Sequence, residues 1–142
     1  MTRCGILRTA GLGLLLGSLA ACDVTGPDGP SGPGILEGTL VSPSGAEGSV
    51  VLELRGGIGL GTVSSAGGEV LYRHSGESTR IVVILDEPGQ IRFSISADDV
   101  GSIPDATVIQ VAGGENALRS SVSGYSVTFT RTENASTMGG GG

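Results

Sequence analysis

The sequence predicts an all-β protein built as a single antiparallel β-sandwich of about eight strands. Apolar and polar residues alternate with a period of two in several short segments. Clusters of Gly, Pro, Asp, Asn and Ser separate these segments at intervals of roughly 8–12 residues, the spacing typical of sandwiches. No stretch of about ten residues has the apolar period of a helix. Aromatic residues are too few to fill a barrel, which favours two stacked sheets.

The clearest strand signals lie over residues 90–97 and 124–131. In the first segment Ile91, Phe93 and Ile95 fall on one face, with Arg and Ser on the other. The second segment alternates in the same way, with Tyr, Val and Phe on its apolar face. We therefore expect two half-buried strands that point their apolar residues into the core.

Residues 50–54 also alternate, whereas 81–84 are apolar at every position, which predicts a central strand covered on both faces. Further strands are expected over 35–41, 58–63, 69–73 and 106–112. The Asp-Glu-Pro-Gly run at 86–89 predicts a turn. A short helical turn is expected around 98–103.

Length, charge and cysteine content exclude several classes of protein. The chain has 142 residues, enough for one domain. Its net charge of −6 argues against nucleic-acid binding, because acidic surfaces repel phosphate. With 2 Cys and 1 His it has too few ligands for a zinc cluster and too few thiols for a disulfide framework. No cofactor is predicted.

Residues 1–21 have the architecture of a secretory signal peptide. Two Arg precede a short apolar run, which is too short to span a bilayer. The run ends in Leu19-Ala20-Ala21-Cys22, which resembles the lipobox of bacterial lipoproteins. The resemblance implies that Cys22 becomes the mature N-terminus and carries diacylglycerol and an acyl chain. It also implies a domain held outside the cytoplasm on the bacterial cell envelope, on either the inner or the outer membrane.

The rest of the chain divides into three parts. Residues 22–34 hold the lipidated Cys and a Pro/Gly-rich spacer, which we expect to be stiff and extended. Residues 35–132 are the only segment able to fold as a domain. Residues 133–142 end in four Gly, and we expect this tail to be disordered.

The strand layout of the domain resembles a group of short bacterial lipoproteins with no assigned activity. More distantly it is similar to cohesin-like and immunoglobulin-like sandwiches. The segments that carry the resemblance are 38–43, 45–46, 50–54, 81–84, 88–93, 118 and 124–125. These are strand patterns rather than site signatures, so the resemblance implies a fold and transfers no functional residue.

Two constellations could carry chemistry. His74, the one histidine, could act as a general base with a serine in a small hydrolase, but its neighbours are those of a solvated loop residue. Asp98, Asp99 and Asp105 could bind Ca²⁺ in a structural wall module, but their spacing suits turn and capping roles equally well.

The sequence therefore favours a membrane-anchored envelope lipoprotein without catalytic residues. We expect it to bind or scaffold an envelope protein through a sheet edge or loops, because exposed ladder groups of an edge strand need partners. The hydrolase and the Ca²⁺-stabilised module remain the alternatives.

Overall fold

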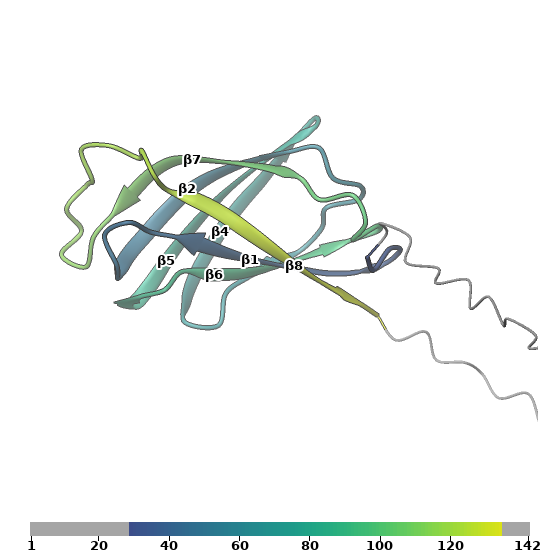
Figure 1. Cartoon of the computed structure of the whole chain (residues 1–142), viewed down its shortest axis with the longest axis horizontal. Helices are drawn as coiled ribbons and strands as arrows, with labels where there is room; N and C mark the ends of the chain where they lie inside the picture. Colours follow the sequence, from purple (N-terminus) through teal and green to yellow (C-terminus); the bar gives the residue numbers. More distant parts are fainter. Residues whose placement is uncertain (1–28, 135–142) are drawn as a thin grey trace, which may run out of the picture.

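The computed structural model describes residues 29–134 and confirms an all-β chain in which two antiparallel sheets of four strands pack as a sandwich (Figure 1). The expected signal peptide, Cys22 and most of the spacer and tail lie outside the described residues. The strands are β1 (Gly34–Val41), β2 (Glu47–Arg55), β3 (Val63–Ser64), β4 (Gly68–Ser75), β5 (Ser78–Gly89), β6 (Arg92–Ala97), β7 (Asp105–Ala112) and β8 (Ser126–Glu133).

The chain passes repeatedly between the two layers. One layer, here called the β1 sheet, has the order β3-β6-β1-β8, and the other, the β2 sheet, has the order β4-β5-β2-β7. β1 and β8 pair antiparallel from Gly34 opposite Glu133, and the amide of Asn134 donates to the Pro33 carbonyl over 3.1 Å. Both ends of the described chain therefore leave the sandwich at the same end (Figure 1).

The core lies between the layers and is built from the predicted inward positions. Ile91, Phe93 and Ile95 on or beside β6 are all buried, as the alternation predicted. The Phe93 ring meets the Phe129 ring of β8 edge to face, with centroids 6.1 Å apart. Gly38 of β1 lies opposite both residues, and a Cβ there would overlap the Phe93 ring. The glycine therefore makes room for the aromatic pair.

Two predicted elements are wrong. Of the strand expected over 58–63, only Val63 is in a strand, and Ile58 forms one isolated bridge to Asp99. Gly57 and Gly59 have φ of 81° and 59°, left-handed values that interrupt an extended strand. The helical turn expected around 98–103 is a bend and a turn instead.

The turn predicted at 86–89 is also wrong, because β5 runs on to Gly89. On the β2 side Glu47 pairs with Gly89, and two residues later Ser49 pairs with Ile84, so β5 carries extra residues at this point. The Asp-Glu-Pro-Gly run therefore forms an irregularity inside the strand.

The prediction that residues 81–84 are covered on both faces is corrected as well. Ile81 and Val83 are buried, but Val82 is half-buried and Ile84 is 40% exposed. Within residues 29–134 the outer face of the β2 sheet has no third layer over it. Several of its apolar side chains are therefore exposed.

Candidate functional site

An apolar row crosses the outer face of the β2 sheet. Leu71 of β4 lies opposite Val82 of β5, and Val82 lies opposite Val51 of β2. Leu71 is 54% exposed, and Ile84 and Ile109 on the same sheet are 40% and 44% exposed. Outward alternation normally places polar groups at such positions, so this row is open to contact with another molecule.

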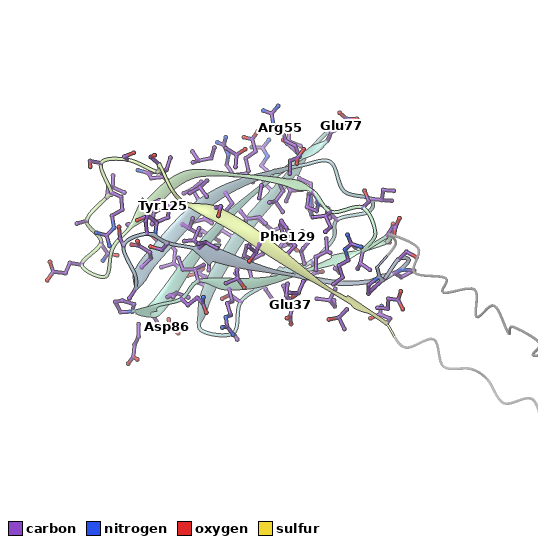
Figure 2. The ribbon with its side chains drawn as sticks, viewed as in Figure 1. Glu37, Arg55, Glu77, Asp86, Tyr125 and Phe129 are labelled. Atoms are coloured by element: carbon purple, nitrogen blue, oxygen red, sulfur yellow. The ribbon has the colours of Figure 1, made fainter. Side chains whose placement is uncertain are left out.

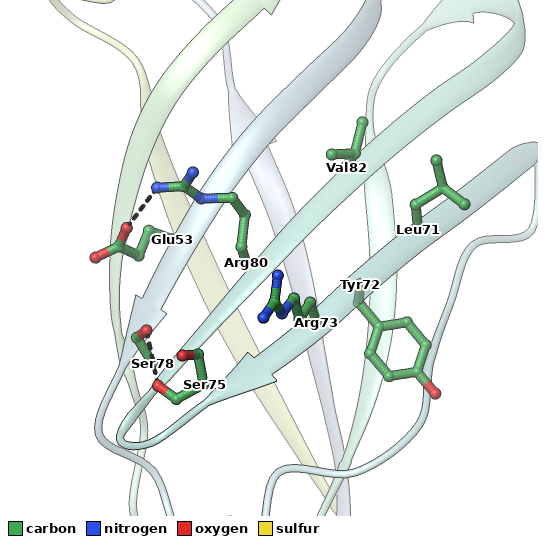
Figure 3. Close-up of a pocket in the computed structure, with 8 residues that line it drawn as sticks. All are labelled: Glu53, Leu71, Tyr72, Arg73, Ser75, Ser78, Arg80 and Val82. Atoms are coloured by element: carbon green, nitrogen blue, oxygen red, sulfur yellow. Dashed lines mark hydrogen bonds and ion pairs between the residues drawn. The ribbon is translucent and has the colours of Figure 1, made fainter.

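A charged row runs beside the apolar one. Arg73 lies opposite Arg80, which in turn lies opposite Glu53. Glu53 forms an ion pair with Arg55 at 2.7 Å. It forms a second ion pair with Arg80 at 3.0 Å, which Figure 3 shows. Hydrogen bonds from Arg55 and then Arg80 lower the pKa of the Glu53 carboxyl below its usual range. Arg73 has no ion pair among residues 29–134.

A shallow depression of about 500 Å³ lies where the two rows meet. Side chains of β2, β4 and β5 line it, and Tyr72 points away to the other side of β4 (Figure 3). The lining combines apolar residues with guanidinium groups, and the depression is open to solvent. Such a surface suits side chains of a docked protein better than an enclosed small molecule.

The strand β4 forms one edge of this sheet. It pairs with β5 over its full length from Gly68 to Ser75, without a shift of register, and no strand formed by residues 29–134 lies on its other side. Proteins commonly shield such edges with bulges, prolines or covering segments. β4 contains no proline, and within the described part of the chain the shielding features on this strand are charged side chains such as Glu69 and Arg73.

The opposite edge of the same sheet is shielded. Where β7 pairs with β2, the register shifts at Val51, which marks a bulge that disrupts a flat edge. The segment after β7 folds back on it, so that the Arg119 amide donates to the Val111 carbonyl over 2.9 Å. Leu118 forms a bridge with Ala112. The two edges of the β2 sheet therefore differ in how open they are to a further strand.

His74, the predicted general-base candidate, lies on β4 rather than in a loop. Its Nδ1 is 2.8 Å from the Thr79 hydroxyl, and its ring meets Tyr72 at a centroid distance of 5.4 Å. Within residues 29–134, the side chain of His74 forms a hydrogen bond with a threonine hydroxyl and with no serine hydroxyl. The structure therefore does not assemble the serine–histidine pair of the hydrolase alternative in this region.

The acidic candidates take separate positions. The Asp99 carboxylate accepts the amides of Gly32 and Gly101, both at 2.8 Å, and these bonds lower its pKa from the usual value. Asp105 begins β7 opposite Arg55. Within residues 29–134, no three His, Cys, Asp or Glu side chains are grouped so that they could hold a metal ion. Asp99 thus has the amide-capping role that the sequence offered as an alternative to Ca²⁺ binding.

A buried carboxylate that the sequence analysis missed closes one end of the sandwich. Glu47 is 1% exposed, and its two oxygens accept bonds from Tyr125 (2.6 Å), Ser42 (2.8 Å) and Arg119 (3.0 Å). Burial raises the pKa of Glu47, but the bonds from Tyr125, Ser42 and Arg119 outweigh it, so the pKa is lowered. Figure 2 shows Tyr125 at the start of the β8 segment.

Cys22, the predicted lipidation site, lies outside the described residues. Between residues 29 and 134 the chain forms no helix with the length and apolar character needed to cross a bilayer.

Comparison of the chain with protein-family models, with curated proteins and with solved structures finds no match. The lipoprotein resemblance and the cohesin-like or immunoglobulin-like resemblance therefore stay predictions from the sequence.

Proposed function

We propose that this chain is a lipid-anchored protein of the bacterial cell envelope that acts by binding another envelope protein, not by catalysis. The anchor is supported by the sequence. Leu19-Ala20-Ala21-Cys22 supplies an attachment point at the start of a Pro/Gly spacer. Two or more acyl chains at such a point hold a domain stably on a membrane.

The observation that carries the binding role is the outer face of the β2 sheet. Exposed apolar side chains, Leu71 and Ile84 among them, lie beside Arg73 and Arg80 on a protein that is acidic as a whole. Apolar area surrounded by charged groups is the usual composition of a protein-binding patch. We infer a partner that presents apolar side chains bordered by carboxylates.

The anchor is tested by replacing Cys22. We expect the native protein in the membrane fraction, with a mass that includes acyl groups on a chain beginning at residue 22. Cys22→Ser should leave the membrane fraction without the lipid mass. A native chain with a bare sulfur, or one that still carries residues 1–21, contradicts the anchor.

The binding role is tested by photocrosslinking in intact cells, with the probe placed on the outer face of the β2 sheet. We expect a crosslinked envelope protein whose yield falls in Arg80→Glu and Ile84→Glu. Glu37→Arg, an exposed change on the outer face of the β1 sheet, is the matched control. Unchanged crosslinking in both face variants, or recovery of the uncrosslinked chain alone, contradicts the role of this face.

A further inference from the structure

We propose that the free edge of β4 pairs with the β4 edge of a second copy of this chain, in a two-fold antiparallel register centred on Leu71. The two β2 sheets then join into one continuous sheet of eight strands. This proposal does not depend on the lipid anchor. It uses Leu71 and Arg73, which also belong to the face proposed above for an envelope protein, but its tests detect only a second copy of this chain.

The first argument is the direction of the backbone groups. β4 and β5 are joined by the two-residue turn Gly76-Glu77, and Ser75 pairs with Ser78. Residues that flank such a turn exchange hydrogen bonds, and bonded pairs then alternate along the ladder. Leu71 and the other odd-numbered residues of β4 therefore bond to β5. The even-numbered residues, among them Tyr72, point their N–H and C=O groups out of the sheet.

This alternation restricts how two β4 strands can meet. Outward-pointing groups of one copy must face outward-pointing groups of the other, so even-numbered residues lie opposite even-numbered ones. The two outer faces then fall on the same side of the joined sheet. An offset that placed odd against even residues would leave the ladder without bonds.

Among the allowed registers, the one centred on Leu71 matches charges. It places Glu69 opposite Arg73 of the second copy, and Arg73 opposite Glu69 of the second copy. Opposite charges in direct cross-strand pairs stabilise a sheet, and like charges destabilise it. Within residues 29–134 neither side chain has an ion pair inside its own copy. A register centred on Val70 or Tyr72 forms neither charge pair.

The apolar side chains match in the same register. Leu71 meets Leu71 of the second copy on the outer face, where it is 54% exposed in one copy alone. On the inner side Val70 meets Tyr72 of the second copy. Tyr72 is 41% exposed because the nearby edge of the opposite sheet is β3, a strand of two residues. A second copy covers the apolar surface that β3 leaves open.

β8, the longer of the two edge strands of the β1 sheet, lacks this self-complementarity. In β8 the register centred on Phe129 places Val127 against Arg131. Arg131 and Glu133 are only two residues apart, so a register that pairs them overlaps over about three residues. The pairing is therefore assigned to β4 and not to β8.

The register is tested with single cysteines in the full chain in intact cells. Leu71 lies on the two-fold axis as a non-hydrogen-bonded pair, where Cα atoms are about 4.5 Å apart, within reach of a disulfide. We expect Leu71→Cys to give a disulfide-linked dimer on mild oxidation. Ile84→Cys is the matched control, because Ile84 is exposed on the same face but away from the edge. The wild-type chain is the second control, because it shows how much disulfide-linked dimer forms through the native residues Cys4 and Cys22.

The outcomes of the cysteine test are distinct. Linkage at Leu71 without linkage at Ile84 supports the pairing. A folded Leu71→Cys chain that stays unlinked overturns it, and so does linkage at Ile84 of equal yield. A disulfide in Tyr72→Cys and none in Leu71→Cys would overturn the register, because it would place the two-fold axis at residue 72 and not at residue 71.

The charge pairs are tested by a swap that does not depend on any cysteine. Glu69→Arg and Arg73→Glu each place two like-charge pairs in the interface. Each should weaken dimerisation of the purified full chain in detergent by about tenfold, measured by sedimentation velocity. The double variant Glu69→Arg with Arg73→Glu should restore it, and Glu37→Arg should change nothing. A double variant as weak as the singles, or a monomeric wild-type chain, overturns the proposal.

Discussion

Glu47 and the strand β4 belong to the same sheet, but their polar groups are satisfied in different ways. At Glu47, side chains from three other segments converge on one carboxylate that is 1% exposed. Along β4, one side of the backbone has no partner strand among residues 29–134, and the side chains of Glu69 and Arg73 are exposed. A buried charge must be paired within the chain. The backbone groups of an exposed edge can bond to water, and can later pair with a second molecule. We therefore expect substitutions in the first region to change stability, and substitutions in the second to change association.

The largest effect is expected when the cation beside Glu47 is removed. Arg119→Ala leaves the Glu47 carboxylate buried without its counter-charge. Loss of one partner of a buried pair is strongly destabilising, and we expect about 3 kcal/mol of unfolding free energy, because Tyr125 and Ser42 still donate to the carboxylate. Urea unfolding measures this value. A loss no larger than that of a surface substitution would show that the ion pair at Glu47 does not hold this end together.

Acid should weaken the same end. The pKa of Glu47 is lower in the folded chain than its ordinary value of 4.5. A lowered folded pKa contributes stability that is fully present above the unfolded pKa and is lost as the pH falls through the folded one. The urea midpoint should therefore be constant near neutral pH and drop below about pH 4.5. In Glu47→Gln the drop should be smaller, and an equal drop in both chains would contradict this role.

A smaller effect is expected from a single hydroxyl. Tyr125→Phe removes the 2.6 Å bond to Glu47 and leaves the ring in place. Because the carboxylate keeps Arg119 and Ser42, we expect a loss of about 1–2 kcal/mol. Tyr72→Phe is the control, since the Tyr72 hydroxyl has no hydrogen bond within residues 29–134. Equal effects of the two changes would show that the Glu47 bond contributes little.

The smallest effect on folding is expected at the edge strand. Leu71→Lys and Arg73→Ala change side chains that face solvent, so the unfolding free energy of one copy should stay within about 0.5 kcal/mol. The same changes should reduce association. A large loss of stability measured at a concentration where the chain is monomeric would mean that β4 is held by contacts within its own copy.

The sequence predicted the fold class because inward positions repeat every second residue. Ile91, Phe93 and Ile95 could be placed from that pattern alone, and all three are buried. The pattern failed over 58–63, where glycines at left-handed φ interrupt the chain, because period two does not record backbone conformation. It also failed at 86–89, where pairing with β2 holds a turn-like run inside a strand.

The candidate surface and the buried network were out of reach for a different reason. Glu47 lies in a Gly-rich stretch, and its partners Arg119 and Tyr125 are 72 and 78 residues away in the sequence. The apolar run at 81–84 predicted cover on both faces, because such a run cannot show that residues 29–134 leave the outer face of this sheet without a covering layer. Both features depend on which strands become neighbours.

The position of the two chain ends also has a mechanical consequence. Gly34 and Glu133 face each other at the open end of the β1–β8 ladder. A force that pulled the two ends apart would act perpendicular to β1 and β8. It would break their hydrogen bonds one after another, starting from this end of the ladder. Such a geometry resists little force, so this corner would open first if both ends were ever held under tension. A domain suspended from its N-terminal end alone escapes that load, since nothing then pulls on β8.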